Sequence, residues 1–175
     1  MKVSSALGVL AAVGFLAACG EAAEEAPPIE TVSMPEPEPI VTCDTPPSNG
    51  AQLTRDGSKG SGPHTVRIVN TSAGNTIVNV RDFASNDMVV SFYVAEGQEA
   101  GVNDIPDGNY RIQYATGGDL GEDCKNFAVL GGASQDPEMI EFPAGSAMTL
   151  TYELTPIVDG NFEGQSIDPD AFAAE

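Results

Sequence analysis

The sequence predicts an all-β protein whose main domain is a single antiparallel β-sandwich, and three observations support this. About seven short runs are rich in β-branched and aromatic residues, turn-forming residues separate them, and polar and apolar residues alternate within the best of them. Roughly 110 residues with this many short strands match the size of an immunoglobulin-like domain. A small open barrel is the alternative architecture, and the strand order cannot be read from the sequence.

The expected strands cover residues 65–70, 76–82, 88–95, 109–116, 126–130, 139–142 and 148–155. Turn formers separate these runs, among them Ser85-Asn86-Asp87, Pro106-Asp107-Gly108 and Gly131-Gly132. No segment of useful length has a helical period. The segments between the strands are therefore expected to be turns and loops.

Alternation is cleanest in two of the expected strands. In 109–116, the apolar positions 110, 112 and 114 share one face, and Arg111 and Gln113 lie on the other. In 148–155, positions 148, 150, 152 and 154 are apolar, and positions 149, 151, 153 and 155 are polar. One face of each strand is therefore expected to be buried and the other to face solvent, as in antiparallel sandwiches.

The amino terminus has the pattern of a secretory signal. A basic residue, Lys2, precedes a run of apolar and small residues that is too short to span a membrane. The run ends in Leu16-Ala17-Ala18-Cys19, which resembles the lipobox of bacterial lipoproteins. That resemblance implies cleavage after residue 18 and a diacylglycerol on Cys19. An ordinary signal peptide or an uncleaved anchor that happens to end in cysteine is the alternative.

Residues 19–47 form an expected disordered linker between the lipidated Cys19 and the domain. Between Gly20 and Pro47 the chain is rich in proline, alanine and glutamate and contains no basic residue, so it cannot bury enough apolar surface to fold. We expect a flexible tether here, the sandwich at 48–158, and an acidic tail at 159–175. A docking motif within the Pro-Glu repeats is the alternative.

The chain is strongly acidic, with 7 Lys+Arg, 26 Asp+Glu and a net charge of −19. Such a charge disfavours nucleic acid and anionic membrane surfaces as partners, and it favours solubility, cations or basic partners. Once Cys19 carries lipid, Cys43 and Cys124 remain as an even pair, which in an exported domain predicts a disulfide. Two free thiols are the alternative.

The domain also resembles a known family. The segment Ile105-Pro106-Asp107-Gly108-Asn109-Tyr110, preceded by Phe92-Tyr93-Val94-Ala95-Glu96-Gly97, is similar to a small β domain of uncharacterised bacterial secreted and membrane-anchored proteins. The similarity covers about residues 65–172 and rests on turn and core positions. It implies a β fold and brings no assigned activity.

Catalytic motifs are absent from the sequence: it has no Gly-x-Ser-x-Gly, His-Glu-x-x-His or Cys-x-x-Cys pattern. The single histidine, His64, follows Gly62-Pro63 and is expected in a loop. Oxygen ligands at Asp159, Asn161, Glu163 and Asp170 form an imperfect calcium loop. A solvated acidic tail is the alternative there.

Two further groups are candidates for binding. Asp104, Asp107 and Asn109 form an acidic turn, for which a purely structural role between strands is the simpler interpretation. The rings at Tyr93, Tyr110, Tyr114 and Phe127 are the available platforms for a sugar. For Tyr110 and Tyr114, core packing is the preferred interpretation.

These patterns together predict a lipoprotein of the bacterial cell envelope, at the outer membrane or the periplasmic face, that displays a β-sandwich. We expect a binding or structural interaction module without catalysis or a cofactor. Its partners would be the membrane, through the lipid, and an unidentified envelope protein or glycan, but not nucleic acid. A calcium- or carbohydrate-binding surface domain is the alternative function.

Overall fold

The computed structural model describes residues 40–155 and 164–173, and all elements below lie in these ranges. The expected signal, Cys19 and most of the expected linker lie outside the described residues. The elements are β1 (Gln52–Arg55), η1 (Gly57–Lys59), β2 (His64–Asn70), β3 (Asn75–Asp82), β4 (Met88–Val94), β5 (Glu99–Ile105), β6 (Gly108–Gly117), β7 (Leu130–Gln135), β8 (Ile140–Phe142), β9 (Thr149–Leu154), β10 (Gln165–Ser166) and α1 (Pro169–Ala173).

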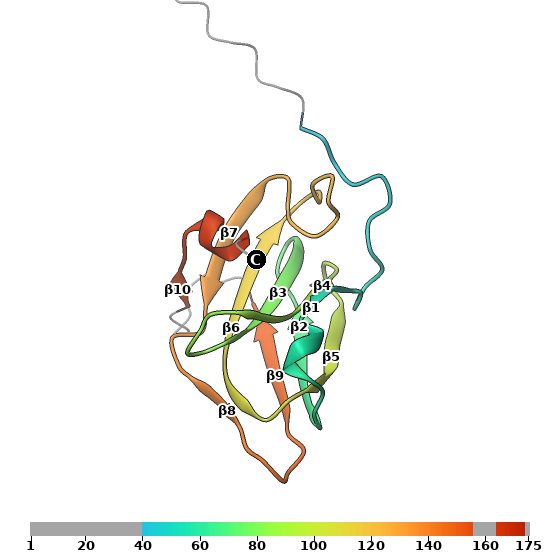
Figure 1. The fold of residues 1–175 in the computed structure, drawn as a ribbon. Coiled ribbons are helices and arrows are strands. Elements are labelled where there is room, and N and C mark those ends of the chain that lie inside the picture. Colours follow the sequence, from blue (N-terminus) through green and yellow to red (C-terminus); the bar gives the residue numbers. More distant parts are fainter. Residues whose placement is uncertain (1–39, 156–163, 174–175) are drawn as a thin grey trace, which may run out of the picture. The chain divides into compact units, whose positions relative to one another are not determined.

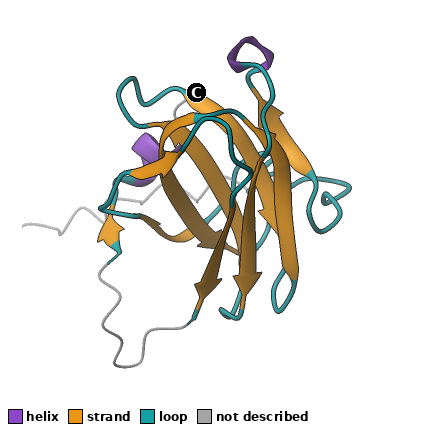
Figure 2. Ribbon diagram, turned by 90° about the horizontal axis from the view of Figure 1, so that it is seen from below, coloured by secondary structure: helices purple, strands orange, loops and turns teal. Residues whose placement is uncertain are grey.

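The strands form two sheets, which confirms the prediction of an all-β sandwich (Figures 1 and 2). The larger sheet has the order β1-β4-β3-β6-β7-β10, with β8 also paired to β6, and the smaller has the order β5-β2-β9. All strand pairs are antiparallel except β2 and β9, which run parallel from Thr65 opposite Thr149 to Asn70 opposite Leu154.

The main core lies between the two sheets. Ile68 and Val66 of β2 point from the small sheet toward Val80, Phe92 and Ile112 of the large sheet, and all of these side chains are buried. Burying a large apolar side chain contributes about 1.5–3 kcal/mol, so this cluster supplies most of the force that holds the sheets together. Apolar residues at alternate positions of β2 and β9 supply the core side chains of the small sheet, and for β9 the alternation in the sequence predicted this.

The large sheet is covered on its second face as well, which differs from the expected solvent-facing surface. Gln113, expected in solvent, is only 4 % exposed. Ile77 and Ala115 on the same face pack with Phe172 of α1 and with Phe127 from the loop before β7. The reason is that segments from both ends of the described chain fold over this face, and sequence alternation within a single strand cannot reveal them.

A disulfide joins Cys43 to Cys124, as the cysteine count predicted, with the two Cα atoms 5.1 Å apart. The backbone N–H of Cys43 also donates to the carbonyl of Leu120 at 2.9 Å. The packed region therefore includes Cys43, which the sequence placed in the linker, and Phe172, which it placed in the tail.

Five strand predictions need correction. The segment 126–130, expected as a strand, is a loop up to residue 129 with one isolated bridge between Leu120 and Phe127, and only Leu130 belongs to a strand, β7. Four strands were missed, namely β1, β5, β7 and β10. β7 was missed because Gly131 and Gly132 were interpreted as a turn, whereas both lie within the strand.

Candidate functional site

The clearest candidate site is a cleft between the two sheets, on the side where β9 faces β7 and β10. Its volume is about 340 Å³, within the range of small-ligand sites. Most of its lining residues carry a hydroxyl group, and they come from both sheets. The cleft is lined by Ser72, Tyr114, Thr116, Ser134, Tyr152, Glu153, Leu154, Thr155, Gly164 and Ser166.

Strand geometry places two tyrosines in this cleft. Tyr152 points inward from β9, and its phenol donates a hydrogen bond to Oδ2 of Asp136, which directly follows β7. Tyr114 points inward from β6, opposite Ser134 of β7. A Cβ atom on Gly164 would lie 2.6 Å from the Tyr114 hydroxyl oxygen, so only glycine allows the chain to pass this close to the phenol.

The surroundings keep both phenols protonated. Burial raises the pKa of Tyr152, and its hydrogen bond and proximity to Asp136 raise it further. Burial also raises the pKa of Tyr114, with a smaller contribution from Asp136. Since an unperturbed tyrosine titrates near pH 10, both groups are neutral hydroxyls at physiological pH. They can donate hydrogen bonds to a ligand, but they are poor nucleophiles or bases.

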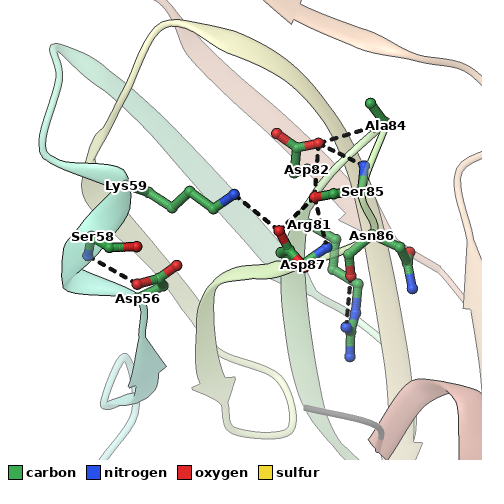
Figure 3. A network of polar contacts seen from close by, with 9 residues as sticks. All are labelled: Asp56, Ser58, Lys59, Arg81, Asp82, Ala84, Ser85, Asn86 and Asp87. Carbon is green, nitrogen blue, oxygen red and sulfur yellow. Dashed lines mark hydrogen bonds and ion pairs between the residues drawn. The ribbon is translucent and has the colours of Figure 1, made fainter.

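A second polar cluster surrounds the turn between β3 and β4 (Figure 3). The ammonium of Lys59 bonds to Oδ2 of Asp87 at 3.1 Å, and the Ser85 hydroxyl bonds to the same atom at 2.7 Å. Asp82 accepts the backbone N–H of Ser85 at 2.9 Å, and this bond is the largest influence lowering its pKa. These contacts close the turn on itself, so the cluster has a sufficient structural role.

Two arginines beside this turn are also held by the fold. Arg55, Arg81 and Lys125 line an open depression of about 640 Å³ next to the turn. The Arg55 guanidinium donates to the carbonyls of Asn103 and Asp104 and so ties β1 to β5. Arg81, 2 % exposed, donates to the carbonyls of Asn86 and Phe172. Both arginines therefore connect elements of the sandwich.

His64 is not a loop residue, contrary to the sequence prediction. It is the first residue of β2, fully buried, and its ring stacks on Phe142 with centroids 4.7 Å apart. Nδ1 accepts the N–H of Met148 at 3.2 Å, so Nε2 carries the proton and donates to Asp107 at 2.9 Å. The prediction failed because the loop signalled by Gly62-Pro63 ends at residue 63, and β2 begins at His64 itself.

The predicted acidic turn of Asp104, Asp107 and Asn109 performs structural roles. Asp104 has a φ of 61° and its carbonyl accepts from Arg55, while Asp107 holds His64. The carbonyl of Asn109 accepts the N–H of Phe83 at 2.9 Å. In residues 40–155 and 164–173, no three metal-binding side chains gather in one place.

The rings proposed as sugar platforms are mostly buried. Tyr93, Tyr110 and Phe127 are 6 %, 4 % and 8 % exposed, which confirms core packing for Tyr110. Tyr114 is half-buried and reaches the cleft. Sequence reasoning missed Tyr152, which it assigned only to an apolar face, because nothing along the chain shows that residue 152 would lie beside residue 136.

Most of the remaining predicted site residues lie outside the described residues. Asp159, Asn161 and Glu163 of the expected calcium loop lie outside the described residues, as does Cys19. Asp170 lies in the first turn of α1, where its N–H bonds to Oδ1 of Asp168 at 2.9 Å. None of the described helices has the length and apolarity that crossing a membrane requires.

Comparisons with known protein families, curated proteins and solved structures found no match to this chain. The resemblances to bacterial lipoproteins and to the small β domain therefore stay predictions.

Proposed function

We propose that this protein is a lipid-anchored component of the bacterial cell envelope whose β-sandwich acts as a binding or structural interaction module without catalysis. The lipobox-like segment ending at Cys19 supports the anchor, because attached acyl chains bind a bilayer through about 0.8 kcal/mol per buried methylene group. The disulfide between Cys43 and Cys124 supports export, since such bonds persist in oxidising compartments.

The cleft between the sheets is the observation that carries the binding role. It is concave, it has the volume of a small-ligand site, and most of its polar groups are neutral hydroxyls, with the carboxylates of Glu153 in the lining and of Asp136 beside Tyr152. Because burial keeps the phenols of Tyr114 and Tyr152 protonated, these groups favour hydrogen bonding to a ligand over nucleophilic attack on it. The high negative charge of the chain makes nucleic acid an unsuitable ligand.

A polyhydroxylated ligand, such as an envelope glycan, is the second candidate function. Hydroxyls and a carboxylate offer the mixture of donors and acceptors that sugar hydroxyls require. The probe is insoluble peptidoglycan sacculi, with which the full chain is sedimented. If the cleft binds glycan, Tyr152→Phe reduces sedimentation, because it removes one hydroxyl and keeps the ring. Tyr93→Phe, which changes a phenol outside the cleft lining, is the matched control and should sediment like the unaltered chain.

The anchor is tested by fractionation. Cys19→Ser should leave a precursor that is soluble or unprocessed, while the unaltered chain fractionates with membranes as a shortened product. A shortened, membrane-bound Cys19→Ser product would contradict the lipobox interpretation.

Calcium binding through the 159–170 segment is tested by thermal unfolding of the full chain with calcium and then with a chelator. A ligand at 100 times its Kd stabilises a protein by about 2.7 kcal/mol, so a tight site would produce a clear shift. A shift abolished by Asp159→Ala would favour the calcium-binding alternative, and an unchanged transition would exclude a tight site.

A further inference from the structure

The outermost strands of the two sheets differ in how their free edges are protected. An unprotected edge presents unpaired backbone N–H and C=O groups to which another chain can bind. β1 has four residues and an irregular register with β4, and β10 has only two residues. Short length and irregularity both discourage strand addition. The long outer strands, β5 and β9, belong to the small sheet.

Side chains from elsewhere in the domain cover the free edge of β5. Asn49 donates its side-chain amide to the carbonyl of Glu99 at 2.9 Å. Arg55 donates to the carbonyls of Asn103 at 2.7 Å and of Asp104 at 3.1 Å. The register of β5 with β2 is also irregular between His64 and Val66. This edge is therefore occupied by the protein's own donors.

The free edge of β9 has no such protection among the described residues. Its register with β2 is continuous over six residue pairs, and the strand contains no proline. The carbonyl of Met148 accepts the N–H of Thr65 in β2, and the carbonyl of Leu154 accepts the N–H of Thr71 just after β2. Because backbone groups alternate in direction, the N–H and C=O groups of Thr149, Thr151 and Glu153 point away from β2. In 40–155 and 164–173, no backbone hydrogen bond crosses that side.

The side chains at this edge are also incompletely covered. Leu150 and Tyr152 face the core, yet both are only half-buried, and no strand within 40–155 or 164–173 lies beyond them. Thr149 and Thr151 on the opposite face are exposed, and their β-branched side chains favour an extended backbone. A further strand beside β9 would extend the sheet and bury more of Leu150 and Tyr152.

The charge around this edge selects the kind of strand that fits. Glu153 lies on β9 itself, and Asp136 and Glu138 lie close enough to Tyr152 to influence its pKa. Arg67, which lies opposite Thr151 on β2, is already paired with Glu99. The edge is thus acidic on an acidic protein, which repels a second copy and attracts a basic segment.

We propose that β9 is a docking edge to which an extended segment of a partner protein, alternating basic and apolar residues, adds as a fourth strand of the small sheet. This inference rests on the proposed binding function and specifies its partner as a peptide strand. Main-chain hydrogen bonds provide the affinity, and the alternate side chains and charges provide the selectivity.

The test uses the full chain, labelled with ¹⁵N, and a blocked peptide of eight residues with the sequence Lys-Val-Thr-Val-Lys-Val-Thr-Val. We expect amide shifts centred on Thr149, Thr151 and Glu153, and about tenfold weaker binding when glutamate replaces the peptide lysines. Two further peptides carry N-methyl groups on either the valine amides or the other amides. In a given orientation only one set of amides faces β9, so the two methylated peptides should bind with clearly different affinities.

A protein variant supplies the complementary test. Thr151→Pro removes an N–H that points away from β2, and Thr151→Val retains it, so the first variant should lose peptide binding and the second should keep it. If Thr151→Pro does not fold, the methylated peptides still test strand addition at β9, because they leave the protein unchanged.

Three outcomes would overturn the proposal: no amide shift, equal binding of both methylated peptides, or shifts confined to cleft residues such as Tyr114 and Ser134. The last outcome would exclude strand addition at β9 but would be compatible with the proposed binding function. The sedimentation and fractionation experiments test that function separately.

Discussion

Removing the disulfide should destabilise the domain by several kcal/mol. Cys43 and Cys124 are 81 positions apart, and closing a loop of this length restricts the unfolded chain by about 4.5 kcal/mol at 25 °C in the chain-entropy model. The bond also holds residues 119–128, whose only regular structure is two isolated bridges and turns. We therefore expect Cys43→Ala/Cys124→Ala to lose about 3–5 kcal/mol of unfolding free energy.

The assay is urea unfolding followed by circular dichroism, since the chain contains no tryptophan to report by fluorescence. The unaltered chain under reducing conditions is the control, because it retains both sulfur atoms and loses only the crosslink. It should be destabilised nearly as much as the double variant. If both unfold within about 1 kcal/mol of the oxidised protein, the two cysteines do not constrain the unfolded chain as argued.

Three further predictions concern single residues. Tyr152→Phe should reduce the loss of stability at alkaline pH, because the raised pKa of Tyr152 in the folded protein stabilises it below pH 10, and this contribution is lost as the pH rises above 10. Unfolding free energies measured from pH 8 to 11 check this. Gly117→Ala should destabilise by about 1–3 kcal/mol, since the new Cβ would lie 2.4 Å from the Phe127 ring, while Gly118→Ala, which meets no atom within 4 Å, should be much milder by thermal unfolding. Phe92→Ala, at a fully buried core position, should lose about 3–5 kcal/mol in urea titrations.

The sequence predicted the strands with strong local signals. β3, β4 and β6 combine β-branched or aromatic residues with clear turns at their ends, and each was predicted to within about two residues. β5 was missed because its sequence, Glu99–Ile105, mixes polar and apolar residues without clear alternation and is mostly exposed, as an outer strand permits. The periodicity of a strand reports burial, so a strand with little burial gives a weak signal.

Contacts between segments that are far apart in the sequence could not be predicted. The parallel pairing of β2 with β9 joins segments about 80 residues apart, and no local pattern encodes it. The same holds for the cleft, where Tyr152 meets Asp136 only because β9 lies opposite the end of β7. The disulfide was predictable because, once Cys19 is assigned to the predicted lipid anchor, only Cys43 and Cys124 remain to pair.

The intact mass of the protein purified from bacterial membranes decides whether the sandwich is displayed on a lipid. We predict a chain that begins at Cys19, carries a diacylglycerol, and gains the mass of two alkyl groups only after reduction. A chain without lipid, or one that begins at another residue, would contradict the proposal that this sandwich is displayed on a lipid anchor.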